Sequence, residues 1–326
     1  MKKIKNLVIV LAIFVLVGIV SAVSVLAADT APFSVDGVKY DTFAEALSAA
    51  DEDSPIFLEK DFDFGASNVP TISNKRVTIN LNCHTLKADG YNSTNTALYN
   101  LFIISGNAHL TITGEGRIDS ERSVINTASA TAKATINGTG KGITIVQSLV
   151  AQTVKVTTAG SSVNFTGNIN FEHRGLKAVA IVLVSSGTSF DATDAIINYN
   201  YSGVTYDFFT AAANSEITIN NSVITTSSLL FNTPNKDLTT TPKVRLNNTD
   251  VKLTSSSAVI FTGKLGAIID GGFLDLGTGS FAANTHIYDP SVGSGILIKN
   301  GVTTTSNLIC SETSPSVAVA KGGFSL

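Results

Sequence analysis

A repeat of about 25 residues constrains this chain more than any other feature of its sequence. Residues 217–222 (Ile-Thr-Ile-Asn-Asn-Ser) and 244–249 (Val-Arg-Leu-Asn-Asn-Thr) superpose at an offset of 27 residues, and residues 269–272 continue the series 23 residues later. Phe165 and Phe190 end comparable segments 25 residues apart. A period that drifts within so narrow a range is typical of stacked coils whose turns absorb insertions.

Each repeat contains short stretches in which apolar and polar residues alternate. Residues 76–82 and 109–113 show the pattern, and Gly, Asn, Asp and Ser separate such stretches from residue 76 onward. Alternation with a period of two predicts strands with one buried face. Together with the repeat, it predicts an all-β, single-domain parallel β-helix whose coils pair in parallel about 4.8 Å apart. Because parallel crossovers are nearly always right-handed, we expect a right-handed solenoid.

Stacking predicts where individual side chains lie. Inward Val, Ile, Leu and Phe should form one continuous core. Asn220 and Asn247 hold matched positions at turns, where Asn tolerates left-handed backbone and can form an amide ladder. Cys83 follows the inward residue Leu81, so we expect it to pack as a small hydrophobe. Cys310 lies on the order of 40 Å away along the stack, so we expect no disulfide between the two cysteines, which requires Cα atoms within about 7 Å.

The first residues have the features of an export signal. Lys2, Lys3 and Lys5 precede an apolar run over residues 7–26, and small residues follow it. We assign residues 1–27 to a cleaved signal peptide, with a retained membrane anchor as the alternative. In either case the sequence predicts an extracellular or cell-surface protein that contacts a membrane only through this segment.

Residues 28–52 predict a cap over the first coil of a β-helix that spans residues 53–326. An Asp-Gly pair within residues 35–40 predicts a tight hairpin. Thr42 and Glu45 have the spacing of a capping box, and the apolar residues that follow share one helical face. A solenoid needs such an element over its open end, so the short helix is expected to protect the core.

Residues 35–47 resemble the opening of bacterial pectate-lyase-like β-helix proteins that are secreted or displayed on the surface. In that family an Asp-Gly hairpin and a Tyr-x-Thr-hydrophobic-x-Glu-Ala helix precede the coils. Residues 78–86 resemble the family's Ile-x-Leu-Asn-Gly-His-Thr-Leu coil, with Cys83 in place of the usual Gly, and residues 104–116 look like the next coil. The resemblance implies a right-handed β-helix. It does not imply one function, because this scaffold hosts lyases, hydrolases, tailspikes and non-catalytic adhesins.

Motifs for polysaccharide cleavage are sparse. The pectin-degrading hydrolases of this fold share Asn-Thr-Asp, Asp-Asp, Gly-His-Gly and Arg-Ile-Lys motifs, and this chain has only Asn-Thr-Asp, at residues 248–250. A turn is the simpler interpretation of that tripeptide. Asp191 with Asp194, and Asp270 with Asp275, are candidate acid pairs that read equally well as turn residues.

Lyases of this fold place carboxylates around calcium and use Arg or Lys as the base. Glu172, His173 and Arg174 form the best local cluster and would be the catalytic residues of an enzyme, with a solvated turn as the alternative. No spacing of His, Cys or Gly indicates a zinc site or a calcium repeat, so we expect no metal and no cofactor. Whether the chain is an enzyme stays open, with a non-catalytic role favoured.

Tyr199, Tyr201 and Tyr206 lie in the one local concentration of aromatic residues. Exposed rings on a flat wall would stack on the apolar face of a sugar, and these three are the candidate ligand-binding residues. The alternative is an inserted loop that folds its rings onto the solenoid.

Charge and composition narrow the class of partner. Beyond the first three lysines, 25 acidic residues outnumber 19 basic ones, which argues against nucleic acid. We therefore expect a non-catalytic β-helix that acts in adhesion, glycan contact or envelope structure, with an extracellular or cell-wall glycan or a host surface as partner. The alternatives are a polysaccharide lyase or glycoside hydrolase with an atypical site, and a self-assembling structural subunit.

Overall fold

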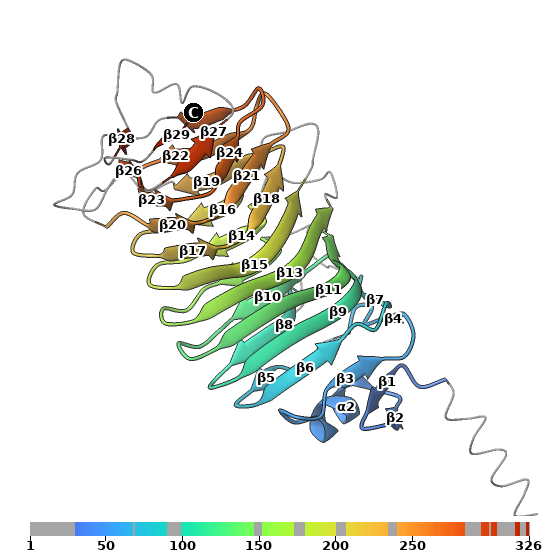
Figure 1. Ribbon diagram of the computed structural model, residues 1–326. Coiled ribbons are helices and arrows are strands. Elements are labelled where there is room, and N and C mark those ends of the chain that lie inside the picture. The colour runs from blue at the N-terminus through green and yellow to red at the C-terminus, as the bar shows by residue number, and fades with distance from the viewer. Residues whose placement is uncertain are drawn as a thin grey trace, which may run out of the picture.

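The chain folds into a parallel β-solenoid of about 7 turns with a short helix near the N-terminus (Figure 1). The expected all-β solenoid with an N-terminal helix is therefore confirmed. The computed structural model describes residues 30–67, 69–89, 99–146, 152–172, 180–199, 207–233, 240–283, 295–299, 301–304, 317–319 and 324–325.

The solenoid has three walls, of which one 20-stranded sheet supplies two. Four long strands of this sheet run through both the first and the second wall. They are β9 (His109–Ser120), β11 (Lys133–Val146), β13 (Ser162–Glu172) and β15 (Ser189–Tyr199).

Shorter strands complete these two walls. The first wall also contains β3 (Ile56–Leu58), β6 (Arg76–Asn80), β17 (Glu216–Asn220), β20 (Lys243–Asn247), β23 (Gly266–Asp270), β26 (Gly295–Ile298) and β28 (Val317–Val319). The second wall also contains β4 (Phe62–Asp63), β7 (Thr85–Ala88), β18 (Val223–Thr226), β21 (Asp250–Leu253), β24 (Phe273–Asp275), β27 (Val302–Thr304) and β29 (Phe324–Ser325).

A separate nine-stranded sheet forms the third wall. Its strands are β5 (Ile72–Ser73), β8 (Asn100–Ser105), β10 (Ser123–Thr127), β12 (Val154–Val156), β14 (Val182–Val184), β16 (Asp207–Ala211), β19 (Leu229–Thr233), β22 (Val259–Gly263) and β25 (Ser280–Ala283). In this wall Phe209, Phe231 and Phe261 lie on successive coils, with ring centroids 5.2 and 5.4 Å apart. The predicted coil-to-coil stacking of inward residues is therefore confirmed.

The cap follows the predicted pattern. Helix α2 (Phe43–Ala49) begins after Thr42, whose side chain accepts a hydrogen bond from the backbone N–H of Glu45 while Glu45 bonds back to Thr42. The strands β1 (Phe33–Val35) and β2 (Val38–Tyr40) form the antiparallel hairpin beside it. Phe43 packs against Phe102 of the third wall, with ring centroids 6.0 Å apart. Thus the helix extends the core at the N-terminal end.

The apolar run that predicts an export signal lies within residues 1–29, outside the described part of the chain. Among the described residues no helix combines the length and the apolar character needed to cross a membrane.

The strand register confirms one predicted alignment and corrects another. Ile217 pairs with Val244, as the 27-residue offset predicts. Phe165, however, pairs with Ala192 rather than Phe190, so the offset there is also 27 residues. The rings of Phe165 and Phe190 still touch, with centroids 4.7 Å apart. Two bulky residues on one inward face gave a false match in the sequence.

The turns between the first and second walls correct two further expectations. The side-chain amide of Asn247 donates to Asn220 at 2.7 Å, as the amide ladder predicts, but the left-handed residues are the next ones, Asn221 and Asn248. Cys83 is exposed, not buried. It occupies the left-handed region with φ 66°, and this turn directs the chain away from the core. Cys310 lies outside the described residues.

Candidate functional site

The outer surface of the first wall carries an almost uncharged array of side chains. In β6, β9, β11, β13, β15 and β17 three positions per strand point outward, two residues apart. The first position carries Arg76, His109, Lys133, Ser162, Ser189 and Glu216 in turn, and the second and third together make twelve positions. All twelve are half-buried, and we call them the hydroxyl–amide face. They are Thr78, Asn80, Thr111, Thr113, Thr135, Asn137, Asn164, Thr166, Asp191, Thr193, Thr218 and Asn220.

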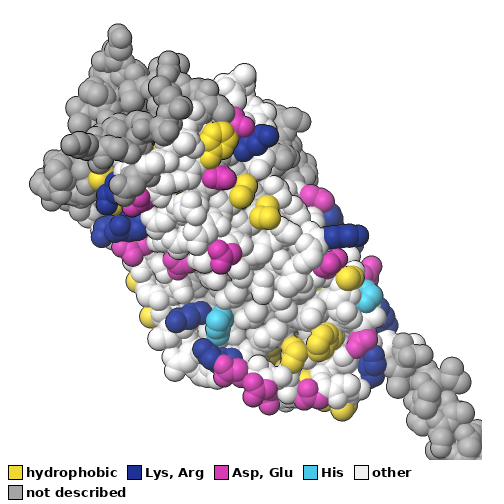
Figure 2. Space-filling model, in the orientation of Figure 1, with side chains coloured by type: hydrophobic (Ala, Val, Ile, Leu, Met, Phe, Trp, Pro, Cys, Tyr) yellow, Lys and Arg dark blue, Asp and Glu magenta, His cyan; other side chains and the backbone are white. Residues whose placement is uncertain are grey.

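Strand register aligns this face into two ranks along the solenoid axis. Thr78 lies beside Thr111, which lies beside Thr135, and each step is one coil, or about 4.8 Å. Eleven of the twelve side chains end in a hydroxyl or a carboxamide. Figure 2 shows the corresponding broad area with few charged or apolar side chains. Such a surface offers hydrogen-bond donors and acceptors at regular intervals.

Asp191 is the one ionisable member of the face. Burial raises the pKa of its carboxyl group, and the negative charge of Glu216 on the next coil raises it further. Asp194, its candidate partner, lies in the following turn with φ 52°. The two therefore do not belong to one outward rank.

A shallow hollow of about 230 Å³ lies where the hydroxyl–amide face meets the cap. Arg76 and Glu52 form an ion pair across it, and Nε2 of His109 lies 2.9 Å from Oγ1 of Thr135. Burial lowers the pKa of His109, and the charges of Arg76 and Lys133 lower it further, so the imidazole is mostly neutral at pH 7. The hollow is lined by Glu52, Arg76, Val77, Thr78, His109 and Thr111.

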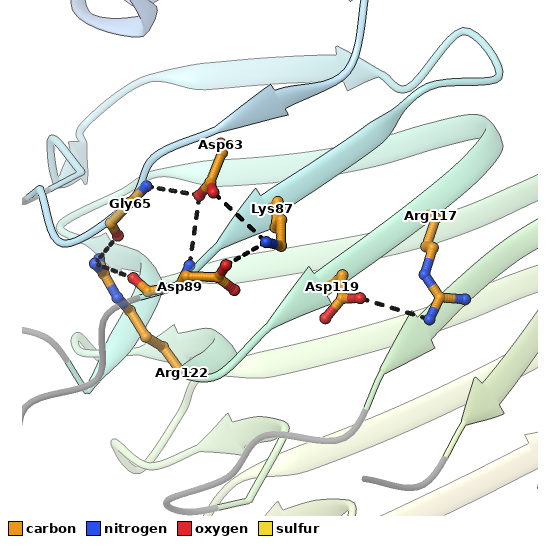
Figure 3. Close-up of polar contacts among 7 residues, drawn as sticks. All are labelled: Asp63, Gly65, Lys87, Asp89, Arg117, Asp119 and Arg122. Carbon is orange, nitrogen blue, oxygen red and sulfur yellow. Dashed lines mark hydrogen bonds and ion pairs between the residues drawn. The ribbon is translucent and has the colours of Figure 1, made fainter.

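The N-terminal part of the second wall is charged, in contrast to the first. Figure 3 shows Lys87 between Asp63 and Asp89, with Nζ 3.7 Å from Asp63 and an ion pair to Asp89. Lys87 pairs in register with Asp119 of the next coil, and Arg117 of that strand lies 3.5 Å from Asp119. Alternating charges therefore satisfy one another along the axis.

Arg122 anchors the far end of this charged region and is completely buried. Its guanidinium donates to the backbone carbonyls of Ser67 at 2.9 Å, Gly65 at 2.5 Å and Asp89 at 3.3 Å (Figure 3). Burial lowers the pKa of the guanidinium, yet arginine stays charged at neutral pH. Arg122 therefore ties three consecutive coils together.

Glu172, the first residue of the catalytic hypothesis, lies on the same wall. It reaches back across the intervening strand β11 to Arg117, at 2.8 Å. The hydrogen bond that Arg117 donates to Glu172 raises the pKa of the Arg117 guanidinium. His173 and Arg174 lie outside the described residues. The contact of Glu172 is therefore an ion pair with an arginine two coils away, a contact invisible in the sequence.

The other acid candidates have structural contacts. Asn248 lies in a left-handed turn, Thr249 is buried and donates to the carbonyl of Ile219, and Asp250 accepts a hydrogen bond from the N–H of Phe273 at 2.9 Å. Asp275 accepts from the N–H of Gly277 within its own turn. In the described part of the chain no three His, Cys, Asp or Glu side chains gather as a metal site would require.

The aromatic candidates divide between the core and the part not described. Tyr199 has no exposed surface, and its ring packs against Phe208 with centroids 5.6 Å apart. In this position its ring cannot stack on a sugar, because the core encloses it. Tyr201 and Tyr206 lie outside the described residues.

The hydroxyl–amide face has a sequence signal that the repeat alignment did not use. Thr-Ile-Asn occurs at residues 78–80, 135–137 and 218–220, and Thr-Ile-Thr at 111–113. The central Ile is inward in each case, so the flanking residues must point outward together. Comparisons of the chain with protein-family models, curated proteins and solved structures found no match. The geometry alone therefore carries the functional argument.

Proposed function

We propose that this chain is a secreted or surface-displayed, non-catalytic β-helix that holds an extended neutral glycan on its hydroxyl–amide face. The observation that carries the proposal is the pair of ranks on the first wall in which eleven of twelve side chains are uncharged. A sugar chain offers hydroxyl groups at regular intervals, and Thr and Asn side chains can both donate to and accept from them. A sugar chain that lies along the axis meets one member of each rank at every coil.

The charge of the face supports a neutral ligand. An acidic polysaccharide would require cationic side chains within the contact area, and the twelve positions include none. The nearest cations lie at the borders of the face: Arg76 and Lys133 at the starts of their strands, and Arg245 beside Thr218 on the next coil. Arg76 is paired with Glu52. The ligand class that fits is therefore an uncharged hydroxyl-rich polymer.

The non-catalytic part of the proposal rests on how the described carboxylates are used. Glu172 pairs with Arg117, and Asp250 and Asp275 accept backbone hydrogen bonds. Glycoside cleavage needs two carboxyl groups about 5–10 Å apart across one sugar-sized gap. Asp191 lies alone within the neutral face, where it could accept hydrogen bonds from a sugar but has no acid partner in its rank.

The test is a binding panel with the purified mature chain. We expect retention on cellulose, chitin or a neutral β-glucan, none on polygalacturonate or alginate, and no release of reducing or unsaturated ends. Thr113→Lys places a charge within the face, on the second of its six strands, and should weaken retention about tenfold, since a desolvated, unpaired charge costs well over 1 kcal/mol. Thr262→Lys makes the same change on the half-buried outer side of the third wall and is the matched control.

Two outcomes would overturn the proposal. One is a binding result: wild type and Thr113→Lys bind equally well, or wild type binds no neutral polymer. The other is product release that Glu172→Gln abolishes, which would make the chain an enzyme.

A further inference from the structure

In the described part of the chain, most of the large exposed apolar side chains lie on the second wall. Among the described residues four large hydrophobic side chains are exposed: Val38 at 56%, Ile196 at 43%, Val223 at 39% and Phe273 at 38%. The last three lie on the second wall, on β15, β18 and β24. Ile196 pairs with Val223, and Val223 pairs with Asp250, whose carboxylate binds the backbone N–H of Phe273. One register row therefore carries three of the four; we call Ile196, Val223, Asp250 and Phe273 the apolar row.

The fold does not require apolar residues at these positions. Ile196 points outward between the buried Ala195 and Ile197. Val223 and Phe273 likewise precede the inward residues Ile224 and Leu274. Single exposed hydrophobics are ordinary on protein surfaces, but their alignment on one row of successive coils is not. The row lies on the C-terminal half of the solenoid, where Figure 2 shows separate hydrophobic side chains with a few acidic and basic side chains beside them.

Polar side chains border the apolar row on both sides. Two residues further along the same strands lie Asn198, Thr225, Lys252 and Asp275, and the side-chain amide of Asn198 donates to Asn170 at 2.9 Å. On the other side the turn residues Asn221 and Asn248 form their own amide ladder at 3.2 Å. A strip with three apolar side chains between two lines of mostly polar residues has the polarity pattern of a pyranose, whose C–H face is apolar and whose hydroxyl groups project from its edge.

We propose that the apolar row is a sugar-stacking subsite for a neutral chain of pyranoses with equatorial hydroxyl groups. The sugar C–H faces pack on Ile196, Val223 and the ring of Phe273. The hydroxyl groups bond to the bordering amides and to the carboxylate of Asp250, which can accept several hydrogen bonds. This inference rests on the proposed glycan contact and adds to it a second, stacking element on the adjoining wall.

The dimensions of the row set the size of the ligand segment. From Ile196 to Phe273 the row spans three coil steps, or roughly 14 Å. A short oligosaccharide covers that length, so a hexasaccharide is long enough to fill the row and extend beyond it. The row is also too small for a stable protein interface, which buries about 800 Å² on each partner.

Calorimetry with cellohexaose and chitohexaose tests the subsite, and the absence of Trp from the chain makes intrinsic fluorescence a poor substitute. We expect Phe273→Ala to weaken binding about tenfold, because it removes the largest apolar contact. Phe273→Tyr keeps a ring and should bind within about twofold of wild type. Val223→Thr keeps the shape but not the apolar character and should weaken binding about threefold. Val38→Thr, the same change at the fourth exposed hydrophobic, should have no effect.

Each outcome separates the subsite from the proposed function. If Thr113→Lys weakens binding while Phe273→Ala and Val223→Thr bind like wild type, the subsite is wrong and the glycan contact stands. If wild type binds neither oligosaccharide nor any neutral polymer, both fail. Sedimentation tests whether a second copy of the chain occupies the row. If wild type is a dimer, Phe273→Ala is a monomer and sugar binding is unchanged, the row is a contact between copies and the subsite is wrong.

Discussion

The first and second walls share strands and a core, yet their outer surfaces differ. On the first wall six successive coils present the same kind of side chain, a hydroxyl or an amide, at eleven of twelve positions. On the second wall the outward residues change along the axis, from the ion pairs around Lys87 to the apolar row that ends at Phe273. The fold dictates the inward residues of both walls in the same way. Outward uniformity is therefore not a requirement of the solenoid.

Strand propensity does not account for the difference. Threonine suits β-strands, and this alone could enrich an outer surface in Thr. The second wall has one such rank as well, from Thr144 through Asn170 and Asn198 to Thr225. It combines this rank with the ion pairs of Lys87, Arg117 and Glu172. The contrast is therefore one of extent: the first wall keeps two hydroxyl–amide ranks over six coils, and the second keeps one over four.

The largest expected effect is a loss of stability in a variant of Arg122, which tests the polar contacts of the second wall. Arg122→Met removes three hydrogen bonds that the buried guanidinium donates to part-buried carbonyls of two neighbouring coils, and it should lower the free energy of unfolding by about 3 kcal/mol. Arg117→Met removes an ion pair that is partly exposed and should cost less than about 1 kcal/mol, and still less in high salt. Urea unfolding followed by circular dichroism compares the two. Equal shifts would mean that the buried guanidinium stabilises no more than a surface pair.

A smaller effect concerns the corner where the two walls meet. Cys83 occupies a left-handed backbone conformation, which costs an L-residue about 1–2 kcal/mol. Replacement by Gly removes this cost. It also gives the unfolded chain more conformational freedom, which destabilises the fold by about 0.5–1 kcal/mol. Cys83→Gly should therefore raise the free energy of unfolding by about 0.5 kcal/mol. The same change at His84, which carries no positive φ, is the control and should destabilise. A lower urea midpoint for Cys83→Gly than for wild type would contradict this account.

The smallest expected effect is a difference in how stability depends on pH between a variant in the hydroxyl–amide face and a variant beside the cap. The pKa of Asp191 is raised in the folded state by burial and by Glu216, so its contribution to stability is present below the unfolded pKa and is lost as pH rises through the folded value. The stability of Asp191→Asn relative to wild type should therefore increase between about pH 4 and pH 7.

Glu59, beside the cap hairpin, provides the opposite sign. Hydrogen bonds from Ser34 and Lys39 lower the pKa of its carboxyl group, so its contribution is present above the unfolded pKa and is lost as pH falls. Glu59→Gln should lose stability relative to wild type at pH 7 and converge with it in acid. Thermal melts across this pH range report both slopes, and parallel slopes for the two variants would refute the assignment.

The fold was predictable because its determinants are local and repeated. Alternating residues define the strands, and the Thr42–Glu45 spacing defines the cap helix. The register was only partly predictable, since turns of variable length separate the coils and two Phe residues can match falsely, as Phe165 and Phe190 do. The outward direction of Cys83 depends on two successive left-handed residues, which only Gly or Asn usually indicates.

The candidate site was less predictable than the fold. Titratable clusters and aromatic residues are the signals of a site that a sequence offers, and they predicted Glu172 as a catalytic residue and Tyr199 as a ligand-binding residue. The structure places the first in an ion pair and the second in the core. Both the hydroxyl–amide face and the apolar row consist of residues more than 20 positions apart that become neighbours only through stacking. No single coil displays either one.

The parallel register of the coils has a consequence for how affinity could evolve. Because each coil repeats the outward positions of its neighbour, duplicating one coil would lengthen a rank by one step and leave every existing contact in place. A polymer already held at several steps meets each further step at high effective concentration, so weak individual contacts combine into strong avidity. Coil number would then tune retention on a long chain while the affinity of each step for one sugar stays the same.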